Sequence, residues 1–319
     1  MFAKAFKSEA YRISRMKSPY ILIAVLMCVL FLINFLYMCV DLYGLMGLSK
    51  EDVEQIQEMG TSVEGYEESF MAGFQAGLDT SENINEEQAP IKILGEGPLY
   101  GESVAVIYSM DVSSLYEALL LAIFIGLYIG NIYSTGLDRN LNVFAGKRMM
   151  LFGTRMLMIS IYSLVLHVFS WITSLFSAAL MGASVELAFD KAFVLYFIVT
   201  WLLLTSFGCI VASMTHITRS KAAGITLGII LSAGILSTIM SIASLMLQRK
   251  LGLESEFNLG NYTVTQNLAT VNLYSDGHFV VRALICAVVY FAAAYILSLM
   301  IVRKRDIAWC SVILYRSSL

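Results

Sequence analysis

Six long apolar stretches constrain this chain more than any other feature of its sequence. A helix needs about 20 apolar residues to cross the hydrocarbon core of a bilayer, and each stretch reaches that length. The chain of 319 residues is 58% hydrophobic and only 14% charged, whereas about a quarter of the residues in a soluble domain are charged. We therefore predict an all-α polytopic membrane protein with transmembrane spans at 19–40, 113–134, 151–183, 191–213, 222–247 and 279–302.

The lysines and arginines divide unequally between the two sides that these spans define. Of the 21 in the chain, most lie before span 1, between spans 2 and 3, between spans 4 and 5, or after span 6, in the predicted tail 303–319. Segments rich in Lys and Arg stay on the cytoplasmic side, so we predict a multi-pass protein of the cell membrane with both termini in the cytoplasm. The charges are scattered beside the spans, which favours membrane lipid over nucleic acid as their partner.

Residues 1–18 have the pattern of an amphipathic helix lying on the inner membrane surface. Phe2, Phe6 and Ile13 fall roughly on one face, and neighbouring lysines and arginines can reach lipid phosphates. Glu9 falls near the apolar face, where a carboxylate is out of place, and is interpreted as a contact with another part of a protein. Pro19 suits the first turn of a new helix, so we predict an elbow: a surface helix, a break and then span 1.

Two polar segments are predicted on the outer side, at 41–112 and 248–278. The first is longer than ordinary connections, which indicates a functional loop or a small subdomain. Within it, aromatic and aliphatic residues recur every four positions from Tyr66 to Leu78, and 95–109 resembles a short extended piece. The second segment is too polar to span the membrane, and we expect short helices that dip into the outer leaflet.

Motifs for catalysis are missing from the sequence. Gly146 and Lys147 are followed by Arg148 instead of Ser or Thr, and no glycine stands five positions before Gly146, so the chain lacks a P-loop. There is no HExxH motif, and the five cysteines show no spacing typical of a zinc or redox site. We predict that the chain is not an enzyme and binds no catalytic group, metal or cofactor of its own.

Several positions inside the predicted spans are candidates for a role beyond packing. His167 lies in the middle of span 3 and is interpreted mainly as an internal polar contact with a neighbouring helix, although ionisable groups in spans often have a function. Glu117, near the outer end of span 2, either reaches the interface or lines a translocation path. Gly224 and Gly228 form a small-xxx-small pair in span 5, which fits packing within the chain or a seam between two subunits.

One compact basic segment separates spans 2 and 3. It reads YSTGLDRNLNVFAGKRMMLFGTRM, with glycines on both sides of a short helical stretch and a basic pair before span 3. Together with the elbow, the six spans and the polar segment before span 6, it resembles the permease subunits of type-2 ABC exporters. That superfamily includes bacterial export permeases for drugs, antimicrobial peptides and polysaccharides. The outside loop at 41–112 is longer than in many members.

The resemblance implies a coupling helix at 135–150 that docks on a separate ATPase subunit, which binds ATP and Mg. The residues placed at this ATPase contact are Gly136, Leu137, Asp138, Arg139, Asn140, Leu141, Asn142, Val143 and Phe144. It also implies a second permease subunit, identical or related, in a bacterial plasma membrane. Amphipathic cargo is expected, such as an antimicrobial peptide, another peptide or a drug, with antibiotic resistance as one context.

Two alternatives stay open at this point. The first alternative is a non-transporting membrane sensor or assembly factor whose outside loop binds a ligand or partner. Such a protein needs no ATPase. An ion-coupled carrier is disfavoured because spans 4 to 6 contain no carboxylate. Association with an ATPase separates the permease from both alternatives.

Overall fold

The structure is a computed structural model that describes residues 2–39, 103–135, 148–181, 191–251, 258–273, 275 and 277–316. This part of the chain is all-α and confirms the predicted polytopic helical class. Its helices are α1 (Phe2–Arg15), α2 (Ser18–Cys39), α6 (Val104–Ser113), α7 (Tyr116–Ser134), α9 (Arg148–Met181), α10 (Lys191–Thr218), α11 (Lys221–Ser232), α12 (Ile235–Leu251), α13 (Val264–Thr270) and α14 (Gly277–Arg316), with a 3₁₀ turn η2 (Leu259–Tyr262) before α13.

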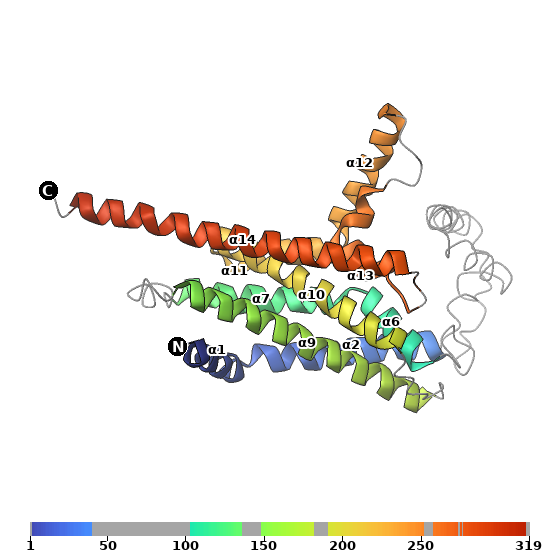
Figure 1. Ribbon diagram of the computed structural model, residues 1–319. Coiled ribbons are helices and arrows are strands. Elements are labelled where there is room, and N and C mark those ends of the chain that lie inside the picture. Colours follow the sequence, from blue (N-terminus) through green and yellow to red (C-terminus); the bar gives the residue numbers. More distant parts are fainter. Residues whose placement is uncertain are drawn as a thin grey trace, which may run out of the picture.

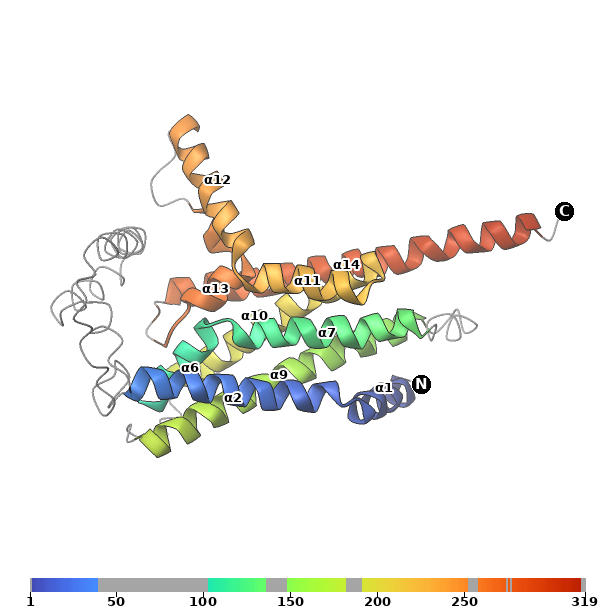
Figure 2. The same ribbon diagram turned by 180° about the vertical axis from the view of Figure 1, so that it is seen from behind.

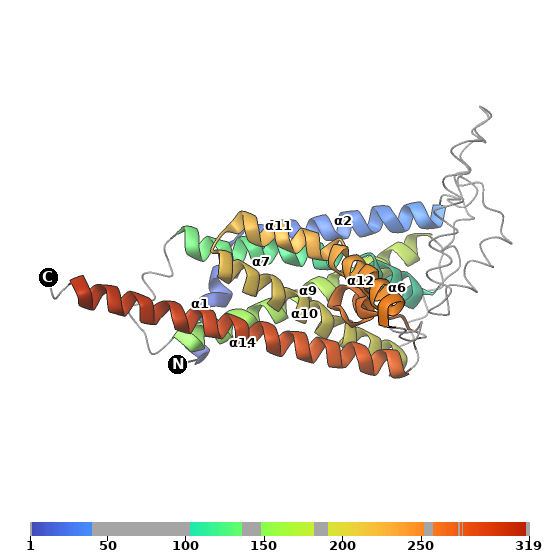
Figure 3. The ribbon, with the colours of Figure 1, turned by 90° about the horizontal axis from the view of Figure 1, so that it is seen from above.

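Five of the described helices are long and apolar enough to cross a membrane, namely α2, α7, α9, α10 and α14. The bent pair α11 and α12 makes a sixth crossing if the two are counted as one span. Figure 3 shows the five long helices and α11 running along one common direction. The N- and C-terminal ends drawn in Figure 1 lie at the same end of this bundle, which agrees with an even number of crossings.

Helix α10 lies at the centre of the bundle and packs against α7, α9, α11 and α14. Leu203 and Phe207 on α10 meet Phe124 and Ile125 of α7 in one continuous core of fully or nearly buried side chains. The faces of α2 and α14 that turn away from the core are apolar and exposed. This division is expected when hydrocarbon, rather than water, surrounds the helices.

The elbow predicted at 1–18 is present. Helix α1 ends at Arg15, Met16 and Lys17 are not helical, and α2 begins at Ser18, directly before Pro19. Proline is well placed there, because the first turn of a helix has no use for the N–H that proline lacks. The break lets α1 pack across the N-terminal part of α9 while α2 runs along the same helix.

Small residues allow α11 to approach α7 closely. A Cβ added at Gly228 would lie 2.5 Å from the Cβ of Ala122 on α7, and one added at Gly224 would collide with Thr215 on α10. Gly126 and Gly130 on α7 meet Ile225 and Lys221 in the same way. The structure therefore places both glycines of the small-xxx-small pair at contacts within the chain.

The predicted single span at 222–247 is wrong in one respect, because the structure divides it into α11 and α12 with a bend of 52°. The helix stops at Ala233, and Gly234 adopts a φ of 71° in the left-handed region that glycine tolerates best. After this turn, α12 projects away from the other helices (Figures 1 and 2).

A row of serines holds α12 against the segment that follows it. Ser237, Ser241 and Ser244 repeat at helical spacing, and they bond Thr265, Asn258 and the N–H of Leu259, respectively, at 2.8, 3.1 and 2.6 Å. The short helices expected within 248–278 are therefore present as η2 and α13. The extended piece expected at 95–109 is wrong where the structure describes it, because 104–109 belong to α6.

Substituting Gly228 tests the close contact of α11 with α7. We expect Gly228→Ala to lower the stability of the purified protein by about 1–3 kcal/mol, because the added methyl group meets the Ala122 methyl group, which cannot rotate away. The matched control is Gly153→Ala, since that glycine is also helical and its added Cβ would lie 3.8 Å from its nearest neighbour. Thermal unfolding in detergent measures both variants, and equal melting temperatures would contradict the close contact.

Candidate functional site

Helix α9 carries a row of polar side chains along the face that it turns into the bundle. The row consists of Ser163, His167, Ser170, Ser174 and Ser177, and every member is fully buried. Successive spacings of four and three residues place them on one side of a helix. Polar groups withdrawn from water in this way need partners inside the protein.

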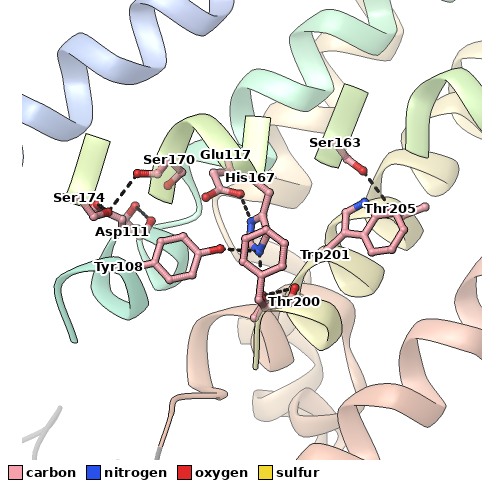
Figure 4. A network of polar contacts seen from close by, with 12 residues as sticks. Tyr108, Asp111, Glu117, Ser163, His167, Ser170, Ser174, Thr200, Trp201 and Thr205 are labelled. Atoms are coloured by element: carbon pink, nitrogen blue, oxygen red, sulfur yellow. Dashed lines mark hydrogen bonds and ion pairs between the residues drawn. The ribbon is translucent and has the colours of Figure 1, made fainter. Parts of the chain in front are cut away.

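His167 is the second member of this row and contacts side chains of three other helices (Figure 4). Its Nδ1 lies 2.7 Å from Oε2 of Glu117 on α7, and its Nε2 lies 2.6 Å from the hydroxyl of Tyr108 on α6 and 3.0 Å from that of Thr200 on α10. An ionised carboxylate can only accept, so Nδ1 is the donor toward an ionised Glu117.

Asp111 joins the same region from α6, three residues after Tyr108. It accepts hydrogen bonds from Nδ2 of Asn34 on α2, at 3.1 Å, and from the hydroxyl of Ser174 on α9. Only 2% of Asp111 is exposed, and burial raises the pKa of this carboxyl to about 7 in spite of the two donors. The contacts attach α6 to both α2 and α9.

Two buried oxygen atoms in this cluster have no hydrogen-bond partner among the described residues. They are Oε1 of Glu117 and the hydroxyl of Ser170. None of the described ion pairs joins Glu117 or Asp111 to a lysine or an arginine. This cluster of Tyr108, Asp111, Glu117, His167, Ser170, Ser174 and Thr200 combines two buried carboxylates with one imidazole and unused hydrogen-bonding capacity. We call it the outer cluster, after the side on which the predicted topology places it, and we name the inner cluster below in the same way.

A second buried cluster lies at the opposite end of the bundle. Glu9 on α1 is 4% exposed and pairs with Arg155 on α9 at 3.3 Å and with Arg12 at 2.7 Å. The hydroxyl of Tyr128 on α7 donates to Glu9 at 3.0 Å, and the Arg12 guanidinium lies over the Tyr128 ring. This inner cluster confirms that Glu9 marks a protein contact instead of a lipid-facing position.

Another contact of this end involves the last turn of α7. The hydroxyl of Tyr133 lies 2.5 Å from Nδ1 of His216 on α10, and the Arg219 guanidinium lies 5.8 Å from the centre of the Tyr133 ring. With the inner cluster, it attaches the end of α7 and the beginning of α9 to the rest of the bundle. These two helix ends flank the loop at 135–147.

The structure brings some of the predicted site residues together and separates others. His167 and Glu117 form one contact, and Glu117 is 1% exposed, so its carboxylate does not reach the interface. Gly224 and Gly228 belong to the packing of α11 against α10 and α7. The nine residues placed at the ATPase contact, 136–144, lie outside the described residues, so that contact stays a prediction.

Sequence reasoning missed Tyr108, Asp111 and Arg155 as members of buried clusters. The spacing of the serines around His167 carries a signal, since polar residues at every third or fourth position of an apolar stretch indicate a face turned away from lipid. Asp111 gave no such signal, because the short helix that contains it follows a polar segment in the sequence.

The raised pKa of Asp111 predicts how stability depends on pH. The folded protein binds a proton at Asp111 up to about pH 7, whereas the unfolded chain releases it near 3.8. Folding stability should therefore be greatest below the unfolded value near 3.8, and it should be lost as the pH rises through the folded value of about 7. We expect Asp111→Asn to remove this part of the pH dependence, measured as the apparent melting temperature across the window; an unchanged slope would contradict the assignment.

A double-mutant cycle tests the ion pair between α1 and α9. Glu9→Gln should destabilise the protein by about 3 kcal/mol, because it removes the carboxylate that Arg155 and Arg12 both contact. Arg155→Gln should destabilise it less, because Arg12 stays paired with Glu9. The double variant should lose clearly less than the sum. Lys7→Gln, an exposed change on the same helix α1, is the matched control and should leave the melting temperature unchanged. Additive losses would show that the pair is not coupled.

Comparison of the chain with models of known protein families, with curated proteins and with solved structures gave no match. The chain is a multi-pass helical membrane protein by the length and hydropathy of its helices. The features of the described residues that bear on a more specific function are the two buried clusters, which attach α6 at one end of the bundle and α1 at the other.

Proposed function

We propose that this chain is the membrane permease subunit of an ATP-driven exporter. It would pair with a second permease subunit and with two separate ATPase subunits. The observation that carries the proposal is the attachment of both helix ends that flank the loop at 135–147. On one side Arg155 binds Glu9, and on the other side Tyr133 contacts His216.

These attachments suit a loop that receives a mechanical movement. The carboxylate of Glu9 and the guanidinium of Arg155 are almost completely shielded, with 6% and 7% of their side chains exposed. A buried pair is costly to break, so α1 and the beginning of α9 should move as one unit. A displacement of the loop would then reach α1, α7 and α9 together instead of being absorbed at a free hinge.

The sequence supplies the reason why such a movement would come from another protein. The chain has no P-loop, and its longest cytoplasmic connection on the predicted topology is the loop that follows α7. That loop combines apolar Leu141, Val143 and Phe144 with charged neighbours, which suits a pocket with a polar rim. The coupling helix and its ATPase partner are therefore part of the proposal.

The substrate path is placed between two permease subunits. The interior of the described bundle is filled by one continuous core that involves α2, α7, α9, α10 and α14, so a path through a single chain would have to part this core. The faces at the circumference are broad and apolar, for example at Val281, Ile285 and Val288 on α14. Such surfaces suit an amphipathic substrate, such as a peptide or a drug.

A sensor or assembly factor is the second candidate, and one contact favours it. Helix α6 follows the long outside segment directly, and Tyr108 and Asp111 attach it to the polar row of α9. The binding of a ligand or partner outside would act on α6 and, through these two contacts, on the interior of the bundle. This function needs no ATPase, which separates it from the first.

Affinity purification tests the proposed function. We expect the tagged chain, expressed together with its neighbouring genes, to retain a P-loop ATPase, and the double variant Arg139→Ala, Phe144→Ala to lose it. Removing one apolar and one charged group from an interface centre typically weakens binding more than tenfold. Lys7→Gln serves as the control that should keep the ATPase. A stable chain that never retains an ATPase contradicts the permease and favours the sensor.

A further inference from the structure

We propose that the outer cluster around Asp111, Glu117 and His167 is a proton-binding site. It holds one proton on Asp111 and one that Glu117 and His167 share. Such a site would serve a permease and a sensor alike, so it does not depend on the proposed function. Three features of the cluster carry the assignment: its charge, its unpartnered oxygen atoms and the two ways in which His167 can be hydrogen-bonded.

The charge of the cluster is the first feature. The titratable groups that interact electrostatically with Asp111 are Tyr108 on its own helix, Glu117 on α7 and Tyr196 on α10, and His167 on α9 contacts Glu117. Asn34 of α2 is uncharged, and α13, which also packs against α6, has no titratable residue.

Among the described residues, no lysine or arginine pairs with Asp111 or Glu117. Two carboxylates buried in this way do not both stay ionised without a proton, because isolated buried charges are strongly unfavourable. A protonated His167 neutralises Glu117, which lies 2.7 Å away. Within the described residues, the donors to Asp111 are the neutral groups of Asn34 and Ser174, so the charge of Asp111 calls for a second proton. The cluster becomes neutral when it holds two protons.

The inner cluster provides the contrast. Glu9 is buried to a similar degree, yet two arginines contact it. Its negative charge is balanced by side chains of the protein and needs no proton. The difference between the two ends therefore lies in the available positive charge and not in burial.

The unpartnered oxygen atoms are the second feature. Oε1 of Glu117 and the hydroxyl of Ser170 are buried and without a hydrogen-bond partner among the described residues, and Figure 4 shows Ser170 on the side of Glu117 that faces Asp111. A hard metal ion takes about six or more oxygen ligands, and the unpartnered side-chain oxygen atoms of the cluster are two among the described residues. A proton on a carboxyl group needs only one acceptor oxygen atom, and these two unpartnered atoms can serve as acceptors within the cluster.

The hydrogen bonds of His167 are the third feature, because both protonation states of the ring find partners. The hydroxyl of Thr200 donates to the carbonyl of Tyr196 at 2.8 Å, so toward Nε2 of His167 it is an acceptor and suits the protonated ring. The hydroxyl of Tyr108 can donate to Nε2 of the neutral ring at 2.6 Å. The proton can leave or arrive without a rearrangement of the helices.

Loss of the protons has a structural consequence at α6. With both carboxylates ionised, the negative charges of Asp111 on α6 and Glu117 on α7 would repel each other. This repulsion loosens the attachment of α6, which leads directly into the predicted outside segment. Protonation would thereby control how firmly α6 is attached to the bundle.

Infrared difference spectroscopy on the full chain in lipid tests the site. As the pH is raised from about 5 to about 9, the wild type should lose the C=O absorption of a buried carboxylic acid, since Asp and Glu otherwise titrate near 4. Asp111→Asn should abolish this loss. Glu117→Gln should move its midpoint to lower pH, because a neighbouring negative charge favours the protonated acid. Glu9→Gln is the matched control and should change neither the band nor the midpoint.

Other outcomes overturn the assignment. The site does not exist if Asp111→Asn leaves the titrating band in place or if Glu117→Gln leaves its midpoint unchanged. If sodium chloride, added at constant pH in place of choline chloride, removes the band, then the cluster binds Na⁺ and the assignment to protons is wrong. Should Asp111→Asn fail to fold, Ser174→Ala keeps the test open: it removes a donor to Asp111, so the band should persist with a midpoint at higher pH.

Discussion

A polar side chain inside a hydrocarbon environment must find its partner within the protein, and this constraint organises the bundle. Helix α9 shows it most clearly, since its buried serines and His167 all lie on one face. Every helix that touches this face brings something polar to it: Asn34 from α2, Asp111 from α6, Glu117 from α7 and Thr200 from α10. Apolar packing alone would leave the rotation of α9 about its own axis weakly defined, because an apolar side chain is equally well solvated by lipid and by the protein core.

The two ends of the bundle meet the same constraint by different means. At the inner end, two arginines hold the single carboxylate of Glu9 in ion pairs, which favours rigid attachment of α1 and of the helices beside the loop at 135–147. At the outer end, carboxylates lie beside an imidazole and hydroxyl groups, which leaves the balance of charge to protons. One end is thus suited to passing on a movement, and the other to responding to its surroundings. A transporter driven from the cytoplasm would use both properties, and a sensor would use the second.

Much of the fold could be predicted from the sequence, because span length and the elbow depend on local patterns such as Ser18-Pro19 before an apolar stretch. The bend after α11 could not, since Gly234 lies in a run of small and apolar residues that also suits a straight helix. His167 and Glu117 were recognisable as unusual, but 50 residues separate them in the sequence. Nothing local predicts that α6 brings Asp111 to the same face. Arg155 looked like one more juxtamembrane charge, and only tertiary packing gives it Glu9 as a partner.

On the proposed function, α1 and the N-terminal part of α9 form one mechanical unit beside the loop at 135–147. Distances between spin labels at position 7 on α1 and position 157 on α9, both exposed, test it most directly. In the complex with its ATPase, we expect one narrow distance distribution that ATP does not shift and that Arg155→Gln broadens. A distance that changes when ATP binds, or that is indifferent to Arg155→Gln, would contradict it.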